Sequence, residues 1–179
     1  MTDLTAAAFV TAFRKVLREK PYDQVKVTEV VERSFFSRQT FYKHFGGAFD
    51  MVIWVYAREP GTPVPNWKAR TAEAFRTTWE YRDMISAAYR SSVRPKLRHY
   101  YRVLGREIGA GAAKELRDRD DAVMMGHVCG SVFEASICDW IASGMKASVK
   151  EVTWYVLLSM GASLRFTPPA PRNILNGRS

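Results

Sequence analysis

The sequence has few of the residues on which enzymes and metal sites depend. Its 179 residues include three histidines and two cysteines. His44, His99 and His127 are scattered, and none has the spacing to Cys, Asp or Glu that a metal site requires. The chain also lacks a GxSxG motif, a Walker loop and a GxGxxG segment that opens a helix. We therefore expect no enzyme activity, no metal site and no cofactor.

Long apolar runs are absent as well. A membrane-spanning helix needs about 18 or more apolar residues in succession, and no stretch of the chain reaches that length. The stretch MTDLTAAAFVTAF carries an acidic residue and no basic start, unlike a signal peptide. On one helix Cys129 and Cys138 would lie on opposite sides and could not pair. We expect a cytoplasmic protein without membrane contact, in which both thiols are reduced and buried.

The composition that remains is that of a folded, basic protein. Hydrophobic residues make up 47% of the chain and charged residues 25%, which suits one sizeable core, or a small head on a larger body. Lys and Arg outnumber Asp and Glu by 27 to 18, so the formal net charge is +9. This excess favours a polyanionic partner, although charge also serves solubility.

Apolar residues recur at helical spacing along most of the chain. The pattern predicts helices over residues 4–18, 28–33, 37–45, 49–58, 67–81, 82–89, 95–108, 120–143 and 149–166. Prolines and a glycine over residues 60–65 break the pattern and mark a domain boundary. We predict an all-α protein with a head of residues 1–57, a larger helical body of 58–166 and a flexible tail of 167–179.

Glycines in the predicted body carry two expectations. The end of the helix predicted over 95–108 should be weakened by Gly105, Gly109 and Gly111. Gly126 and Gly130 are four positions apart, so they share a helix face that permits close approach to a neighbouring helix.

A row of basic residues also runs through the body at a spacing of four. Its members are Arg90, Arg94, Arg98, Arg102 and Arg106. The row predicts either a site for an anionic ligand or nucleic acid, or a solvated helix face. We favour the solvated face, because rows of charge on helices are usually at the surface.

The stretch from Thr28 to Phe45, TEVVERSFFSRQTFYKHF, predicts two short helices joined by a tight corner. Thr28 and Ser37 are the expected caps, because a side-chain hydroxyl can accept from backbone N–H groups of a helix's first turn. Residues 34–36 form the corner between the two helices.

The second of these helices has two distinct faces. Phe41 and Phe45 share an apolar face, while Gln39 and Lys43 point nearly the opposite way. With Arg38 also outside, such a helix suits the DNA major groove, where Arg reads guanine and Gln reads adenine. An ordinary helical hairpin with a solvated outer face is the alternative.

The letters of this stretch resemble the helix-turn-helix of the TetR/AcrR family of bacterial repressors. The resemblance is carried by Val27-Thr28 and by Ser37-Arg38-Gln39-Thr40-Phe41-Tyr42-Lys43-His44-Phe45, and it continues through Asp50 and the apolar run that follows. It implies a head that binds double-stranded operator DNA and a body for ligand binding and dimerisation. In this family a small-molecule effector in the body changes the spacing of the two heads of a homodimer, whose two C-terminal helices pair across a two-fold axis. Burial of those helices in a monomer core is the alternative.

The resemblance also implies individual DNA contacts. Arg38 is the first candidate for a base-edge contact, to guanine, and Gln39 is the second. Lys43 would reach a base or a phosphate, and Thr40 would offer its methyl group to thymine or its hydroxyl to phosphate. Contacts to the phosphate backbone fall on Thr28, Ser37, Tyr42 and His44.

Two positions depart from the family pattern. Phe35 stands in the corner where the family usually has glycine, and a positive φ there would strain a phenylalanine by about 1 kcal/mol. The family often has a lysine at the start of the next helix, near Ala48, where this chain reads Gly46-Gly47-Ala48. The register of docking on DNA is therefore less well defined by the sequence than the fold.

These observations favour a sequence-specific transcriptional regulator, a repressor released by a small-molecule effector. Two other functions stay open. One is a non-specific nucleic-acid binder that uses total charge and the row of arginines. The other is a ligand- or partner-binding protein whose head has lost operator binding.

Overall fold

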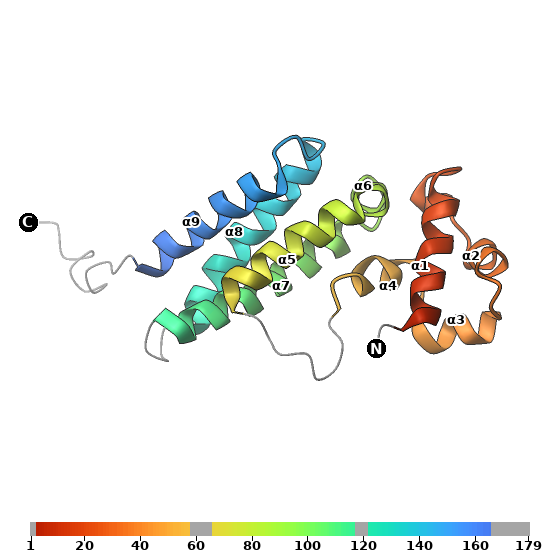
Figure 1. The fold of residues 1–179 in the computed structure, drawn as a ribbon, viewed down its shortest axis with the longest axis horizontal. Coiled ribbons are helices and arrows are strands. Elements are labelled where there is room, and N and C mark those ends of the chain that lie inside the picture. Colours follow the sequence, from red (N-terminus) through yellow and green to blue (C-terminus); the bar gives the residue numbers. More distant parts are fainter. Residues whose placement is uncertain (1–2, 58–65, 117–121, 166–179) are drawn as a thin grey trace, which may run out of the picture.

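The protein is built from helices alone over the part of the chain that can be described. This computed structural model describes residues 3–57, 66–116 and 122–165, which form nine α-helices and no strand. A small helical head lies at one end of an elongated molecule and a larger helical body at the other (Figure 1). The predicted all-α fold is confirmed. The predicted boundary at 60–65 and the predicted tail at 167–179 lie outside the described residues.

The head packs around the first helix. Its elements are α1 (Leu4–Leu17), the short 3-10 turn η1 (Tyr22–Gln24), α2 (Val27–Ser34), α3 (Arg38–His44) and α4 (Ala48–Trp54). The ring of Phe9 on α1 meets the ring of Phe41 edge-on, with centroids 5.2 Å apart, and also contacts Phe45 at 6.3 Å. The aromatic side of α3 is thus fixed against α1, as the spacing of its phenylalanines predicted.

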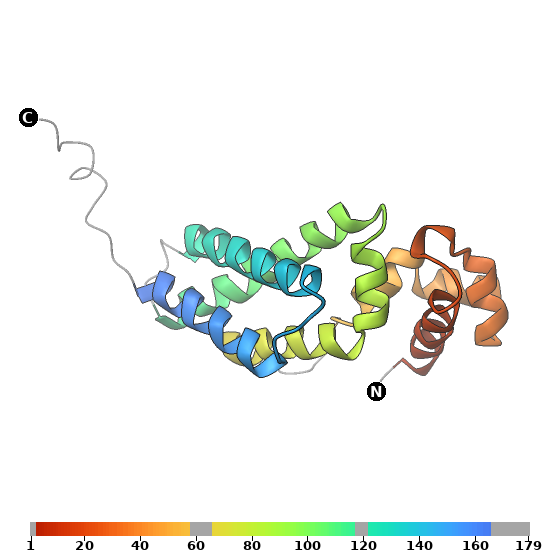
Figure 2. The same cartoon turned by 90° about the horizontal axis from the view of Figure 1, so that it is seen from above.

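The body consists of four long helices and one short crossing helix. Its elements are α5 (Trp67–Glu80), α6 (Arg82–Tyr89), α7 (Arg94–Leu116), α8 (Ala122–Ala142) and α9 (Val149–Arg165). In Figure 2 α6 crosses the end of the body that faces the head. None of the helices in the described ranges is both long and apolar enough to cross a membrane.

Close contact between α7 and α8 explains the glycines of the body. A Cβ atom on Gly105 would lie 2.9 Å from the Cα of Gly130, and one on Gly109 would lie 2.4 Å from the Cβ of Cys129. The expected weakening of the helix near these glycines was wrong: α7 continues to Leu116 because its glycines let α8 approach. The predicted contact face of Gly126 and Gly130 is confirmed.

The arginines of the predicted row are all exposed, and two of them also hold a buried carboxylate. Arg98 Nε and Arg102 Nη2 each lie 2.7 Å from an oxygen of Glu134, whose side chain is 5% exposed. Burial acts to raise the pKa of Glu134, but hydrogen bonds from Arg102 and Arg98 outweigh it and bring the pKa below its ordinary value. The row therefore joins α7 to α8 in addition to lying in solvent.

Polar contacts join the head to the crossing helix of the body. Arg14 Nε on α1 donates to Asp83 Oδ2 on α6 at 2.9 Å. Asp23 in η1 accepts from the hydroxyl of Ser92 at 2.6 Å, just before α7 begins. The head thus rests on α6 and on the turn that follows it.

Candidate nucleic-acid interface

The first helix of the predicted DNA-binding pair begins one residue earlier than its expected cap. Lys26 is the N-cap of α2, and its backbone N–H donates to Glu29 Oε2 at 3.0 Å. The prediction that Thr28 caps this helix was wrong, because the carboxylate of Glu29 satisfies the helix start instead. Thr28 lies in the first turn with an exposed side chain. Its hydroxyl makes no cap and remains available to a phosphate.

The corner between α2 and α3 adopts a left-handed backbone at Phe35. Phe35 has φ 62° and ψ 14°, and its side chain is 96% exposed. Ser34 belongs to α2 rather than to the corner, and its hydroxyl accepts from the N–H of Phe36 at 3.3 Å. The ring of Phe36 turns inward to Phe9, with centroids 5.6 Å apart. The sequence raised the question of a positive φ at Phe35, and the structure has one.

Ser37 caps α3, as predicted. Its Oγ accepts from the N–H of Thr40 at 3.0 Å, and it lies 2.8 Å from the hydroxyl of Thr40. One of the two hydroxyls donates to the other, so one O–H of the pair remains free to donate. The pair can therefore offer a donor to a phosphate without losing the cap.

The outer face of α3 is polar and cationic. Arg38, Gln39, Tyr42 and Lys43 are exposed. The guanidinium of Arg38 lies over the ring of Tyr42, 5.6 Å from its centroid. Within the described residues no carboxylate pairs with Arg38 or Lys43. The helix presents two unneutralised positive charges and one amide on a rigid support.

His44 lies at the C-terminal end of α3 and faces the start of α1 with one of its nitrogens. Its Nδ1 is 2.8 Å from Asp3 Oδ2. Asp3 Oδ1 in turn accepts from the N–H groups of Thr5 and Ala6 at the beginning of α1. Nδ1 is thus engaged within the head, and only Nε2 is left for a contact outside it.

The first turn of α4 carries the acidic residue Asp50, two positions after Ala48, near which the family pattern often has lysine. Asp50 Oδ2 accepts from the backbone N–H of Gly46 at 2.7 Å. This carboxylate accepts from an N–H group just before the helix and puts a negative charge in the first turn of α4. The beginning of α4 is therefore poorly suited to a phosphate.

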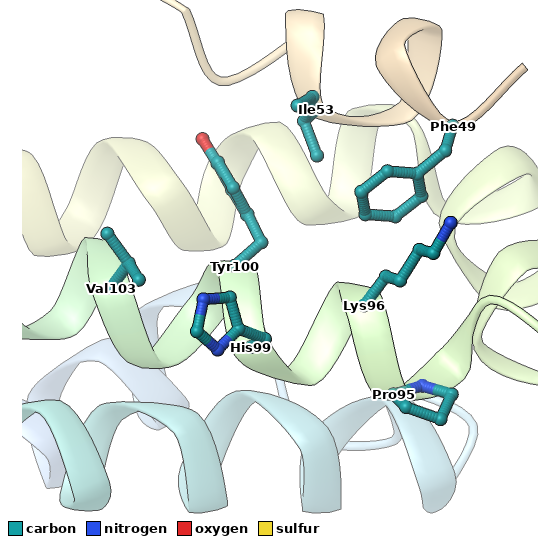
Figure 3. A pocket seen from close by; sticks show the side chains of 7 residues that line it. All are labelled: Phe49, Ile53, Pro95, Lys96, His99, Tyr100 and Val103. Carbon is teal, nitrogen blue, oxygen red and sulfur yellow. The ribbon is translucent and has the colours of Figure 1, made fainter. Parts of the chain in front are cut away.

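A groove between α4 and α7 is a second feature, which reasoning from the sequence missed. It has a volume of about 540 Å³ and is lined by Phe49, Ile53, Pro95, Lys96, His99, Tyr100 and Val103. Figure 3 shows Phe49 and Ile53 pointing from α4 toward α7, and Lys96 and Tyr100 pointing back. The sequence shows apolar residues at helical spacing in both segments, but this pattern does not indicate that the two helices are in contact.

The chain just beyond α4 is anchored in the core of the body. Tyr56 is buried, and its hydroxyl lies 2.7 Å from Thr78 Oγ1 on α5 and 2.9 Å from the hydroxyl of Tyr101 on α7. Arg70 donates to the carbonyl of Tyr56 at 3.1 Å. A change in the spacing of α4 and α7 would therefore act on the C-terminal end of α4, next to this anchor.

Two helices at the C-terminal side of the body present large apolar side chains to solvent. On α8 these are Val123, Met124 and Val128, and on α9 they are Trp154, Tyr155 and Leu158. Surface residues of this size, gathered on two neighbouring helices, are typical of an interaction surface.

Comparisons with known proteins agree with this architecture. No family model matches the sequence, and no relative is found among curated proteins. Among solved structures, the chain is similar to the dihydroxyacetone kinase operon activator DhaS, with a TM-score of 0.67 and 15% sequence identity. The match covers 90% of this chain and 96% of that chain. The chain therefore shares, from head to body, the helical fold of a solved transcription activator.

Proposed function

We propose that the protein is a sequence-specific DNA-binding transcriptional regulator of the TetR type. The observation that carries the proposal is the outer face of α3, where Arg38, Gln39 and Lys43 are exposed and have no acidic partner among the residues that the structure describes. The opposite face of the same seven-residue helix is fixed by buried aromatic rings. A rigid cationic helix of this kind fits the major groove, and the fold shared with an operon activator is consistent with it.

The side chains would divide between bases and phosphates. Arg38 would read guanine, Gln39 would read adenine, and Lys43 would reach a base or a phosphate. Thr40 would place its methyl group near a thymine or its hydroxyl on a phosphate. The remaining phosphate contacts would come from Thr28, Ser37, Tyr42 and His44, the last through Nε2.

We also propose that the protein acts as a homodimer in the cytoplasm. The exposed apolar side chains of α8 and α9 supply a surface for a second copy. Two heads on one dimer would read two half-sites at a fixed spacing. Leu158→Glu should shift the protein from dimer to monomer in sedimentation experiments. Glu107→Gln, at an exposed position of α7, is the control and should leave the mass unchanged.

The proposed effector site is the groove between α4 and α7. Its lining is mostly apolar, its volume of about 540 Å³ suits a small molecule, and Lys96 adds a positive charge without a carboxylate partner among the described residues. This chemistry fits a small amphipathic carboxylate. A ligand there would touch α4, which connects the DNA-binding helices to the body, and could release the protein from DNA.

The effector proposal has its own test. Octanoate should lower the affinity of the protein for its operator, while octanol should be weaker. Lys96→Gln should remove the difference between acid and alcohol, and Lys114→Gln at an exposed position of the same helix should preserve it. Equal responses of both variants would reject this site.

The central test is binding to the DNA just upstream of the protein's own gene. Fluorescence anisotropy at two salt concentrations, with random duplex as competitor, separates the candidate functions. Binding that survives competition is expected for a sequence-specific regulator. Binding that competitor removes would favour a non-specific binder, and no binding at either salt would favour a protein whose head has lost operator binding. A reporter on the same promoter then distinguishes repression from activation.

A further inference from the structure

Phe35 occupies a backbone conformation that phenylalanine rarely adopts. Its φ of 62° and ψ of 14° fall in the left-handed region, where a side chain with a Cβ is disfavoured and glycine is not. It shares positive φ with Met145, the other such non-glycine residue in the described ranges, but Met145 is buried in the body core. Packing in the core compensates the backbone strain at Met145. The exposed side chain of Phe35 has no comparable packing.

No ring contact within the described part of the head accounts for the aromatic ring at this position. Phe35 is 96% exposed, and among the described residues its ring meets no other ring. The neighbouring Phe36 supplies the packing of the corner through its contact with Phe9. A glycine at position 35 would relieve the strain and cost the core nothing. The ring therefore contributes little to folding, and its exposure leaves it available for a contact outside the chain.

The position of the corner indicates which partner this is. Phe35 precedes the cap Ser37 by two residues and Arg38 by three, so it lies beside the N-terminal end of α3. In a helix-turn-helix this end of the second helix contacts base edges in the major groove. The corner adjoins a cationic surface, because Arg38 has no acidic partner in the described part of the chain. Both facts favour duplex DNA over a second protein surface.

The chemistry of the ring narrows the contact further. A phenyl ring neither donates nor accepts a conventional hydrogen bond, so it cannot read the polar edges of bases. The apolar group that the major groove offers is the C5-methyl of thymine. We propose that Phe35 contacts the methyl group of a thymine at the edge of each half-site and thereby adds sequence preference there. The inference rests on the proposed operator binding and deepens it.

The test removes the methyl group and the ring separately. Each thymine of the operator is replaced singly by deoxyuridine, which lacks only the C5-methyl, and binding is measured for wild type, Phe35→Gly and Phe36→Leu. Wild type should lose about three- to fivefold in affinity at one thymine per half-site, as expected for one buried methyl group. Phe35→Gly should bind the two duplexes equally, and Phe36→Leu should retain the wild-type difference.

Stability measurements separate a lost contact from a damaged fold. Phe35→Gly should unfold at the same temperature as wild type or higher, because it relieves the left-handed strain, while it binds the thymine operator more weakly. Phe35→Asn, which also tolerates this conformation, should behave in the same way. A deoxyuridine response in Phe35→Gly identical to that of wild type would overturn the inference while leaving operator binding intact. Absence of specific binding by wild type would instead overturn the proposed function, and this inference with it.

Discussion

The hydroxyl of Tyr101 donates to the hydroxyl of Tyr56 across 2.9 Å of buried space. The donor and the acceptor of this bond can be assigned because each hydroxyl group has a single hydrogen to donate. Thr78 donates its hydrogen to the carbonyl of Ala74 at 2.8 Å, so Tyr56 must donate to Thr78 and must accept from Tyr101. The chain of hydrogen bonds runs from α7 through the end of α4 to α5.

This order predicts unequal effects for two matched variants. Tyr101→Phe removes one hydrogen bond and should cost about 0.5–1.5 kcal/mol of unfolding free energy. Tyr56→Phe removes two and leaves the buried O–H of Tyr101 without an acceptor, so it should cost about 1–3 kcal/mol. Urea unfolding of both variants and of wild type measures the difference. A larger loss for Tyr101→Phe would contradict the direction of the chain.

Two glycines of α7 should respond to alanine with opposite signs. Gly105→Ala would put a Cβ 2.7 Å from the Cβ of Phe133, and overpacking of this kind costs about 1–3 kcal/mol. Gly111→Ala has open space around it and should gain up to about 1 kcal/mol from the higher helix propensity of alanine. Thermal unfolding of the two variants checks both signs. A Gly105→Ala variant as stable as wild type or more stable would mean that α8 does not approach α7 as closely as described.

The carboxylate of Glu134 should make stability depend on pH in the acidic range. Its pKa is lowered in the folded protein, so its contribution is complete above the unfolded value of about 4.3 and is lost as the pH falls through the folded value. Glu134→Gln should cost about 1–2 kcal/mol at pH 7, and its gap to wild type should narrow below about pH 4.

Urea unfolding at several pH values tests this expectation. Glu107→Gln, on the exposed surface of α7, is the matched control and should show a small gap that changes little with pH. A gap for Glu134→Gln that stays constant down to pH 3 would mean that Arg98 and Arg102 do not hold a charged carboxylate.

Sequence patterns predicted those features that depend on residues a few positions apart. The cap by Ser37 follows from the chemistry of its hydroxyl, and the inward face of Phe41 and Phe45 follows from helical spacing. The structure has all three as expected. The cap predicted at Thr28 was wrong, although it too depended only on residues close together in the sequence. Two side chains within the turn could supply the cap, and Glu29 does so. The local sequence thus limits which side chains can cap a helix, but it does not always determine which one does.

The sequence pattern could not predict features that depend on contacts between residues far apart in the chain. Gly105 looked like a weak point of a helix because the sequence does not say that Gly130 faces it. The groove needs Phe49 and Lys96 to meet from two helices 47 positions apart in the chain. The sequence shows the positive charge of the arginine row, but it does not show that Glu134 is buried beneath two of these arginines. Packing between elements determines each of these.

The sharpest variant of the DNA-binding surface is Arg38→Ala. Arg38 lies 5.6 Å above the ring of Tyr42 at the exposed end of α3, so its loss should leave the fold intact. If it reads a guanine, the variant should lose about 1–3 kcal/mol of binding free energy and lose its preference at one base position. Tyr42→Phe keeps the aromatic ring but removes the hydroxyl, and should weaken binding to all sequences alike.

Arg82→Ala is the matched control, because the guanidinium of Arg82 lies 4.7 Å from the ring centroid of Trp79 in the body. It removes the same charge and a similar ring contact far from α3 in the chain. Binding to a library of singly substituted operators compares the three variants with wild type. A uniform loss in both arginine variants would mean that total charge governs binding. Loss of base preference in Arg38→Ala alone would assign that preference to the N-terminal end of α3.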